Sequence, residues 1–188
     1  TSGGQPFDTG RLGEISVMET VDLDGVVAHI LERPLAHGAR VVGEIDWARR
    51  FDHMQQHTGQ HVLSAAFDRL AGNPTMSVHI GGDVSSVDLQ HETTAVEIER
   101  AVDEANRVVW DDRPVSIRFA SAEDAASLPL RKESAREGPL RLIDVDGFDL
   151  SACGGTHVAR TGAIGVIAVI GAERLRGGTR VTVVCGGR

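Results

Sequence analysis

Residues 55–72 read QQHTGQHVLSAAFDRLAG, an apolar, helix-like stretch that carries His57 and His61. Residues four apart share one face of a helix, with Cβ atoms roughly 5–6 Å apart, so both imidazoles can reach one ion. A second pair with the same spacing, Cys153 and His157, lies in the segment CGGTH. The two glycines between them let the backbone turn sharply, so that a thiolate and an imidazole can point the same way. Together the four side chains form a nitrogen and sulfur ligand set suited to zinc.

The two pairs are separated by about ninety residues, so the fold itself must assemble the site. In a zinc finger, by contrast, all ligands lie within one short unit. Two histidines at this spacing are more often surface residues than ligands, and His53 lies on the same helical stripe as His57 and His61. Spacing alone therefore does not select the ligands. The added cysteine and histidine favour a metal site, since a free cysteine is otherwise usually a small buried hydrophobe.

These motifs carry a family resemblance. HTGQHVLSAAF, followed far downstream by SACGGTHV, resembles the editing domain of alanyl-tRNA synthetases and their free-standing relatives, the AlaX proteins. Three further segments fit in the right order: SGGQPFDTG (2–10), SVHIGGDVSSVDL (77–89) and TRVTVVCGGR (179–188). The resemblance selects His57, His61, Cys153 and His157 as the zinc ligands. It leaves His53 as a surface residue in the first helical turn.

The resemblance implies a zinc-dependent aminoacyl-tRNA deacylase acting on Ser-tRNA(Ala), and also on Gly-tRNA(Ala). Water positioned at the metal by the four ligands would cleave the ester at the acceptor end of the tRNA. A small pocket cannot reject serine or glycine by fit alone, whereas a second site that hydrogen-bonds the serine hydroxyl discriminates against alanine. The candidate substrate contacts near the motifs are Gln5, Thr9, Thr58, His79, Ser85, Ser86 and Thr156. Thr58 could instead be a solvent-facing helix residue, Ser85 and Ser86 an ordinary edge-strand pair, and His79 an ordinary strand histidine.

The net charge of −8 is unusual for a protein that binds nucleic acid, because phosphate contact normally needs a basic surface. The charge is unevenly spread: residues 1–128 carry 10 Lys and Arg against 21 Asp and Glu, and residues 129–188 carry 9 against 6. The second region is therefore net positive, by 9 − 6 = +3. The basic residues around CGGTH predict a local positive rim for the tRNA 3′ end: Arg131, Lys132, Arg136, Arg141, Arg174, Arg176 and Arg180. Solvated surface charge remains the alternative for each of them.

Other functions stay open at this stage. Four protein ligands fill a tetrahedral zinc, and closed shells are typically structural, whereas catalytic zinc keeps one position open. A zinc-stabilised tRNA-binding module without hydrolytic activity is therefore one alternative, and a hydrolase of another small ester is a second. Threonyl-tRNA synthetases carry a similar domain, but the GGQP element together with CGGTH favours the alanyl branch.

The expected fold class is α+β, with helices on an antiparallel sheet. Short strands around Asp24-Gly25, a strong hairpin signal, predict a glycine-rich, barrel-like β subdomain over 1–45. A zinc-binding editing domain is expected over 46–188. Its first helix begins at Asp46 or at Asp52, where Gln55 completes a capping-box pattern, and it ends at Gly72. A second helix is expected over 94–110 and a short third over 121–128. Further strands are expected at 75–80, 84–89, 114–119, 140–145, 163–170 and 179–184.

The two cysteines, Cys153 and Cys185, do not form a disulfide framework. A metal thiolate at Cys153 indicates a reducing compartment, and the expected location is the cytoplasm. No apolar run approaches the ~20 residues that span a bilayer, so no membrane association is expected.

Overall fold

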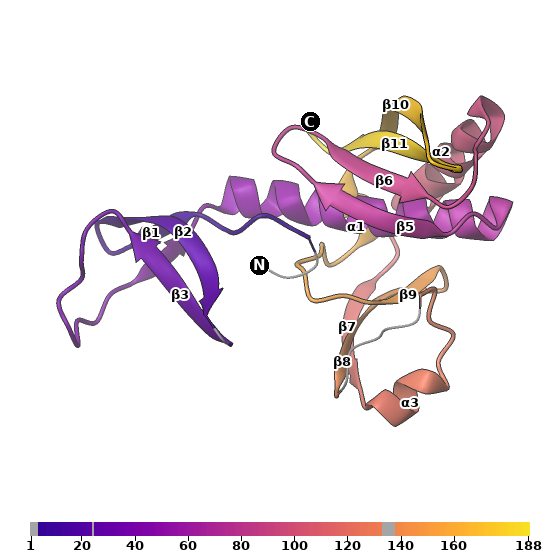
Figure 1. Cartoon of the computed structure of the whole chain (residues 1–188). Helices are drawn as coiled ribbons and strands as arrows, with labels where there is room; N and C mark the ends of the chain where they lie inside the picture. Colours follow the sequence, from indigo (N-terminus) through magenta and orange to yellow (C-terminus); the bar gives the residue numbers. More distant parts are fainter. Residues whose placement is uncertain (1–3, 24, 133–137) are drawn as a thin grey trace.

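The computed structural model describes residues 4–23, 25–132 and 138–188. Its central element is helix α1 (Trp47–Ala71), which runs through the molecule from the N-terminal sheet to the far side (Figure 1). Asp46 caps the helix by accepting the Arg49 N–H at 3.1 Å, and Gly72 ends it in a left-handed conformation. Asp46 is thus the true start. The alternative start at Asp52 is wrong, because the Asp52 carboxylate lies inside the helix and pairs with Arg188.

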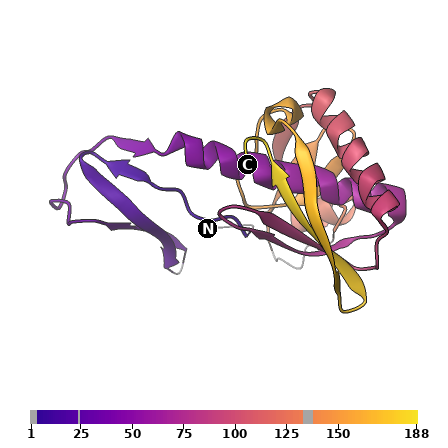
Figure 2. The same ribbon diagram turned by 90° about the horizontal axis from the view of Figure 1, so that it is seen from above.

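A four-stranded antiparallel sheet covers α1. It has the order β10-β11-β6-β5 and contains β5 (Thr75–Ile80), β6 (Ser85–Leu89), β10 (Ile167–Leu175) and β11 (Gly178–Cys185). Helix α2 (Ala95–Trp110) begins at Thr94 with a complete capping box and packs beside α1 on the same sheet face. Only one face of β6 and β11 is buried, and its residues join those of both helices in the main core. Figure 2 shows how β10 and β11 lie across the two helices. The predicted α+β class is confirmed.

A separate three-stranded antiparallel sheet carries the cysteine loop. It consists of β7 (Val115–Ala120), β8 (Leu140–Val145) and β9 (Asp149–Ala152), with β8 in the centre. The short helix α3 (Ala122–Ala126) packs on one face of this sheet with Leu140 and Leu142. The sequence pattern did not indicate β9, because this strand has only four residues and its buried positions are the polar Asp149 and Ser151. A short 3₁₀ turn η1 (Thr161–Ile164) then precedes β10.

The N-terminal strands form a third sheet beyond the start of α1 (Figure 1). Its order is β3-β2-β1-β4, with β1 (Gly10–Leu12), β2 (Ile15–Leu23), β3 (Val26–Leu31) and β4 (Gly43–Ile45). Within the described residues β3 and β4 are the two edges and do not pair, so this subdomain is an open sheet.

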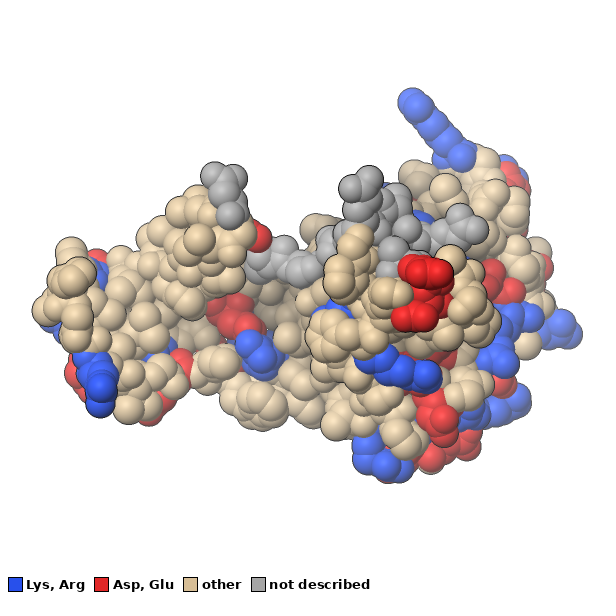
Figure 3. All heavy atoms as spheres, turned by 90° about the horizontal axis from the view of Figure 1, so that it is seen from below, with Lys and Arg blue, Asp and Glu red and all other residues tan. Residues whose placement is uncertain are grey.

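Polar contacts of Asp8 and Gln5 help to tie the N-terminal segment to the rest of the chain. Asp8 pairs with Arg50 in the first turns of α1, and the Gln5 side chain donates to the Thr156 hydroxyl at 2.8 Å. Figure 3 shows the surface hollowed between the N-terminal sheet and the remainder of the molecule. Among the described residues, no helix is both long and apolar enough to cross a membrane.

Candidate metal centre

The structure brings His57, His61, Cys153 and His157 together. One potential ligand atom from each lies within 4.8 Å of all the others. The Cys153 sulfur is 3.2 Å from Nε2 of His57, and the ring centroids of His57 and His157 are 4.4 Å apart. The four side chains that the sequence selected therefore converge on one point, although they come from distant segments.

Rigid local structure positions each pair. His57 and His61 lie one turn apart on the buried stretch of α1 and are 2% and 5% exposed. Cys153 follows β9, and Arg141 of β8 fastens the loop behind it by donating to the Cys153 and Gly155 carbonyls at 2.7 and 2.9 Å. Gly155 packs so closely on the His57 ring that a Cβ at this position would overlap the ring atoms. The CGGTH loop thus needs glycine at position 155 because the backbone approaches the His57 ring closely.

Each histidine uses its Nδ1 atom for a protein contact, which orients the ring. Nδ1 of His57 lies 3.0 Å from Oε1 of Gln5, and Nδ1 of His61 lies 3.1 Å from Oδ2 of Asp149. Both partner oxygens are acceptors, so these Nδ1 atoms carry the hydrogen.

His157 also uses its Nδ1 atom for a contact with the protein. Nδ1 of His157 lies 3.2 Å from the Thr58 hydroxyl, which already donates to the Met54 carbonyl and therefore accepts from the ring. Nε2 is consequently the atom that each ring turns toward the cluster, and a metal there would bind it in the unprotonated form.

Electrostatics at the cluster favour the charged thiolate. Burial alone would raise the pKa of Cys153, but contacts with His157, His57 and His61 outweigh burial and lower that pKa to about 2. Burial also lowers the pKa of His157 to about 3, so this imidazole is neutral at pH 7. The pKa of His61 is raised: burial opposes its charge, but Asp149 and Cys153 outweigh burial. A thiolate surrounded by imidazoles is the donor set of a zinc site.

One buried nitrogen supports the same interpretation. Nε2 of His157 is buried and has no hydrogen-bond partner within the described part of the chain. An unsatisfied buried polar atom costs about 1–3 kcal/mol, and a bound cation would remove that cost. The residues present therefore fit a zinc ion.

The cluster borders a cavity of about 660 Å³. His57, His61 and Cys153 form one part of its wall, and the polar side chains of Gln60, Thr75 and Ser77 form another. Three basic residues, Arg131, Lys132 and Arg141, complete the wall, and their role as a rim for the tRNA 3′ end stays a prediction. Arg131 is also paired with Asp149 at 2.7 Å.

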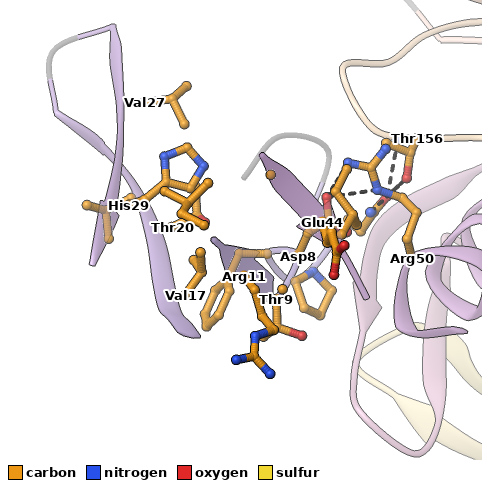
Figure 4. A pocket seen from close by; sticks show the side chains of 18 of the residues that line it. Asp8, Thr9, Arg11, Val17, Thr20, Val27, His29, Glu44, Arg50 and Thr156 are labelled. Carbon is orange, nitrogen blue, oxygen red and sulfur yellow. Dashed lines mark hydrogen bonds and ion pairs between the residues drawn. The ribbon is translucent and has the colours of Figure 1, made fainter. Parts of the chain in front are cut away.

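A second cavity, of about 610 Å³, lies on the other side of the Gly154–Thr156 loop, and Gly154 lines both cavities. Its walls come from the N-terminal sheet and from the glycine-rich segment that includes Gln5 and Thr9. Figure 4 shows Val27 and His29 of β3 across this space from Asp8 and Glu44. Gln5 and Thr156, two predicted substrate contacts, are thus hydrogen-bonded to each other in the wall between the metal cluster and this cavity.

Several predicted site residues lie elsewhere. His79 is exposed on β5, Ser85 is 1% exposed, and Ser86 is half-buried; none of the three lines either cavity. Arg174 pairs with Glu92, and Arg174 and Arg176 are also absent from the two cavity walls. Arg180 pairs with Asp88, and Arg136 lies outside the described residues.

Two expectations about helix α1 need correction. His53 was predicted to be a surface residue, but it is 1% exposed, and burial lowers its pKa. The error arose because the helix begins at Asp46, which places His53 in its second turn, over the core. Thr58 is 0% exposed, so the solvent-facing alternative is wrong. Its role as a substrate contact stays a prediction.

Several residues beside the cluster were not predicted from the sequence. Asp149 accepts from His61, from Arg131 and from the Ser151 hydroxyl, and its side chain is fully buried. Gln60 and Thr75 donate to a shared partner, Ser64, beside the cavity. The alternation of Asp149 and Ser151 before CGGTH could have indicated an inward-facing polar strand, but four residues give a weak signal.

Known proteins resemble this chain in sequence. Residues 140–182 match the model of the threonyl and alanyl tRNA synthetase second additional domain. The chain is 36% identical over 176 residues to the alanyl-tRNA editing protein Aarsd1 of Mus musculus, covering 92% of this chain and 43% of that protein. It is 34% identical over 202 residues to the alanine–tRNA ligase of Pyrococcus abyssi, covering 98% of this chain and 22% of the ligase.

The chain thus spans less than half the length of these relatives. Along almost its own whole length, however, it is similar to both kinds of protein. The resemblance to the alanyl-tRNA editing domain and its free-standing AlaX-type relatives, predicted from the sequence, is therefore confirmed.

Proposed function

We propose that this chain hydrolyses the ester of mischarged Ser-tRNA(Ala), and of Gly-tRNA(Ala), with a zinc ion held by His57, His61, Cys153 and His157. The observation that carries the proposal is the convergence of three Nε2 atoms and one thiolate, with Nε2 of His157 buried and unpaired within the described residues. The similarity to alanyl-tRNA editing proteins supports the tRNA substrate. When bound, zinc would act as a Lewis acid and lower the pKa of water at the cleavage site.

The protein residues prepare the site in three ways. Gln5, Asp149 and Thr58 hold the histidine rings with Nε2 toward the cluster, so no reorganisation is needed at the time of reaction. Burial of the cluster on the α1 side excludes bulk water there. The cavity that borders the cluster is where the aminoacylated 3′ end would enter.

Discrimination between serine and alanine would use the polar wall of the 660 Å³ cavity. Gln60 and Thr75 are fixed by their hydrogen bonds to Ser64 at 2.8 Å each, so their positions are set before a substrate arrives. A serine hydroxyl could pair with such groups, whereas alanine would leave them unsatisfied. Of the predicted contacts, Thr156 and Gln5 also border the cluster, and we retain both in this role.

The tRNA acceptor end is the proposed partner. Arg131, Lys132 and Arg141 give the cavity wall a local positive charge despite the net charge of −8. This proposal includes the predicted division of the chain into a β subdomain (1–45) and an editing domain (46–188). It also includes the predicted location in the reducing cytoplasm.

One structural observation favours a second candidate function. Four candidate ligand side chains lie together, and they would fill the shell of a tetrahedral zinc, which is typical of structural sites. In that case the protein would be a zinc-stabilised module that binds tRNA without hydrolysing it.

The test is a deacylation assay on Ser-tRNA(Ala) and Ala-tRNA(Ala), after the zinc content has been measured. We expect one zinc per chain and rapid loss of serine only. Cys153→Ala should abolish both zinc binding and deacylation. Cys185→Ala is the matched control, because the Cys185 thiol is 1% exposed, has a pKa raised by burial to about 12, and lies outside the cluster. Stoichiometric zinc with no hydrolysis of either ester would instead support the binding module.

A further inference from the structure

An exposed aromatic ring lies on the edge strand of the sheet that carries the metal-binding loop. Phe119 of β7 is 75% exposed, and Ile117 on the same strand is 54% exposed. Phe51, Phe67 and Phe148, in contrast, pack in the main core. One exposed apolar residue is ordinary in a protein surface, so the position of Phe119, rather than its exposure, carries the argument.

The strand register places Phe119 on the face of the sheet that looks toward the metal cluster. Phe119 of β7 pairs with Arg141 of β8. Farther along β8, Val145 pairs with Asp149 of β9, which contacts His61. Residues at even spacing along a strand share a face, so Phe119, Arg141, Val145 and Asp149 all lie on this one. The opposite face packs against α3 and is therefore covered.

Arg141 connects the ring to the site. Directly opposite residues in antiparallel strands have Cβ atoms about 4.5–5.5 Å apart, so Phe119 and Arg141 are neighbours. The Arg141 guanidinium holds the Cys153 and Gly155 carbonyls and lines the 660 Å³ cavity together with Arg131 and Lys132. Phe119 is thus one side chain away from the loop that carries two metal ligands, at the basic margin of the cavity.

We propose that Phe119 is a stacking platform for the base that precedes the aminoacylated adenosine of the tRNA 3′ end. This inference rests on the proposed function, because it assigns a position to the single strand that would lead into the cavity. Single-stranded RNA is commonly held by bases stacked on aromatic side chains, with basic groups beside the backbone. Phe119 supplies the aromatic face, and Arg141 supplies positive charge next to it.

A second copy of the chain is a weaker candidate for this surface. Together Phe119 and Ile117 expose roughly 250 Å² of side chain, whereas a stable interface buries about 800 Å² on each partner. The patch is, however, large enough for one base.

The experiment measures binding of a fluorescently labelled alanine-tRNA minihelix with a single-stranded 3′ end. Phe119→Ala is expected to weaken binding about 5- to 150-fold, the range of one lost base stack. In deacylation assays the same variant should raise KM with kcat unchanged, since the contact is made equally in the ground and transition states. Phe119→Trp should restore affinity, and Phe119→Leu should not, because leucine preserves the apolar character but lacks an aromatic face.

Trp110→Ala is the matched control, because Trp110 is 74% exposed at the end of α2 and lines neither cavity. It should bind the minihelix as the wild type does. Zinc content equal to that of the wild type would show that the Phe119 variants keep the loop intact.

The outcomes separate this inference from the proposed function. If the wild type binds and deacylates but Phe119→Ala is unchanged, or if Phe119→Leu restores affinity, stacking is wrong and the proposed function stands. If Phe119→Ala turns a dimer into a monomer in sedimentation, the patch is a contact between copies, and the inference is overturned. If the wild type neither binds the minihelix nor deacylates the tRNA, the proposed function fails and this inference fails with it.

Discussion

The Asp149 carboxylate lies 3.1 Å from Nδ1 of His61 and fixes which ring nitrogen of this histidine faces the Cys153 sulfur. Its other oxygen accepts from Arg131 at 2.7 Å, and the Ser151 hydroxyl donates to both oxygens. A fully buried carboxylate is thus satisfied on every side while it orients a ligand. A histidine–carboxylate pair of this kind accompanies most metal-bound histidines and tunes their affinity.

Asp149→Asn should weaken zinc binding about 10- to 100-fold, the usual effect of removing an orienting partner of a ligand. The amide retains the shape of the carboxylate but loses the charge that stabilises the His61 hydrogen. Competition with a chelating dye measures the affinity. Asp144→Asn, on the opposite face of the same sheet, is the control and should bind zinc as the wild type does. Equal affinity of Asp149→Asn and wild type would exclude the orienting role.

Gly155→Ala should disrupt the site because the new methyl group would overlap the His57 ring. Forcing extra atoms into a packed site typically costs about 1–3 kcal/mol. We expect zinc affinity and deacylation both to fall at least about tenfold, which corresponds to about 1.4 kcal/mol. Gly82→Ala is the control, since a Cβ there would meet nothing within 4 Å. If both variants bind zinc equally well, the close approach to His57 is unimportant.

Asn106 of α2 bridges the helix to β10. Its amide donates to the Ile167 carbonyl at 2.8 Å and accepts the Ile167 N–H at 2.9 Å. Asn106→Leu would leave two buried backbone groups unpaired, at about 1–3 kcal/mol each. We expect the free energy of unfolding in urea to fall by about 2–5 kcal/mol, whereas the exposed neighbour Arg107→Ala should change it by less than about 0.5 kcal/mol. If Asn106→Leu leaves the free energy of unfolding unchanged, the Ile167 backbone groups must find other hydrogen-bond partners.

The metal-free protein should lose stability at acid pH through Asp149. Burial opposes its charge, but His61 and Arg131 outweigh burial and lower its pKa to about 2. The unfolded chain takes up a proton at this carboxyl near its ordinary pKa of about 3.9, and the folded chain does so only near pH 2. The stabilisation is therefore complete above about pH 5 and is lost as the pH falls from about 4 to 2. Urea titrations at several pH values should show that the free energy of unfolding of the wild type falls between about pH 4 and pH 2. The fall should be smaller in Asp149→Asn. Equal pH dependence of the two proteins would contradict the role given to Asp149.

The convergence of the four candidate ligands and most helices and strands could be predicted because their signals lie in short motifs. The family resemblance selected His57 and His61 where the i, i+4 spacing left His53 equally possible, and Gly72 marked the end of α1. β5 and β8 begin and end where the hydrophobic alternation predicted. Each of these helix and strand signals lies within one short stretch of sequence.

The supporting residues could not be predicted because their partners are distant in the sequence. Asp149 meets His61 across 88 positions, and Thr58 meets His157 across 99. Nothing in the neighbourhood of His53 shows that the core covers it, since its burial depends on where α1 begins and on what packs over it. Separation of the strands into three sheets is likewise a tertiary outcome that alternation does not encode.

The hydrogen bond between Gln5 and His57 also constrains the order of folding. Gln5 reaches both His57 and Thr156, which is 151 positions away. A fragment that starts at Asp46 would contain all four ligands, yet His57 would lack the acceptor for its Nδ1 hydrogen. The ring would then be free to exchange tautomers and to turn its wrong nitrogen to the ion. We therefore expect tight metal binding to develop late in folding, after the Gln5 segment has packed against His57 and Thr156.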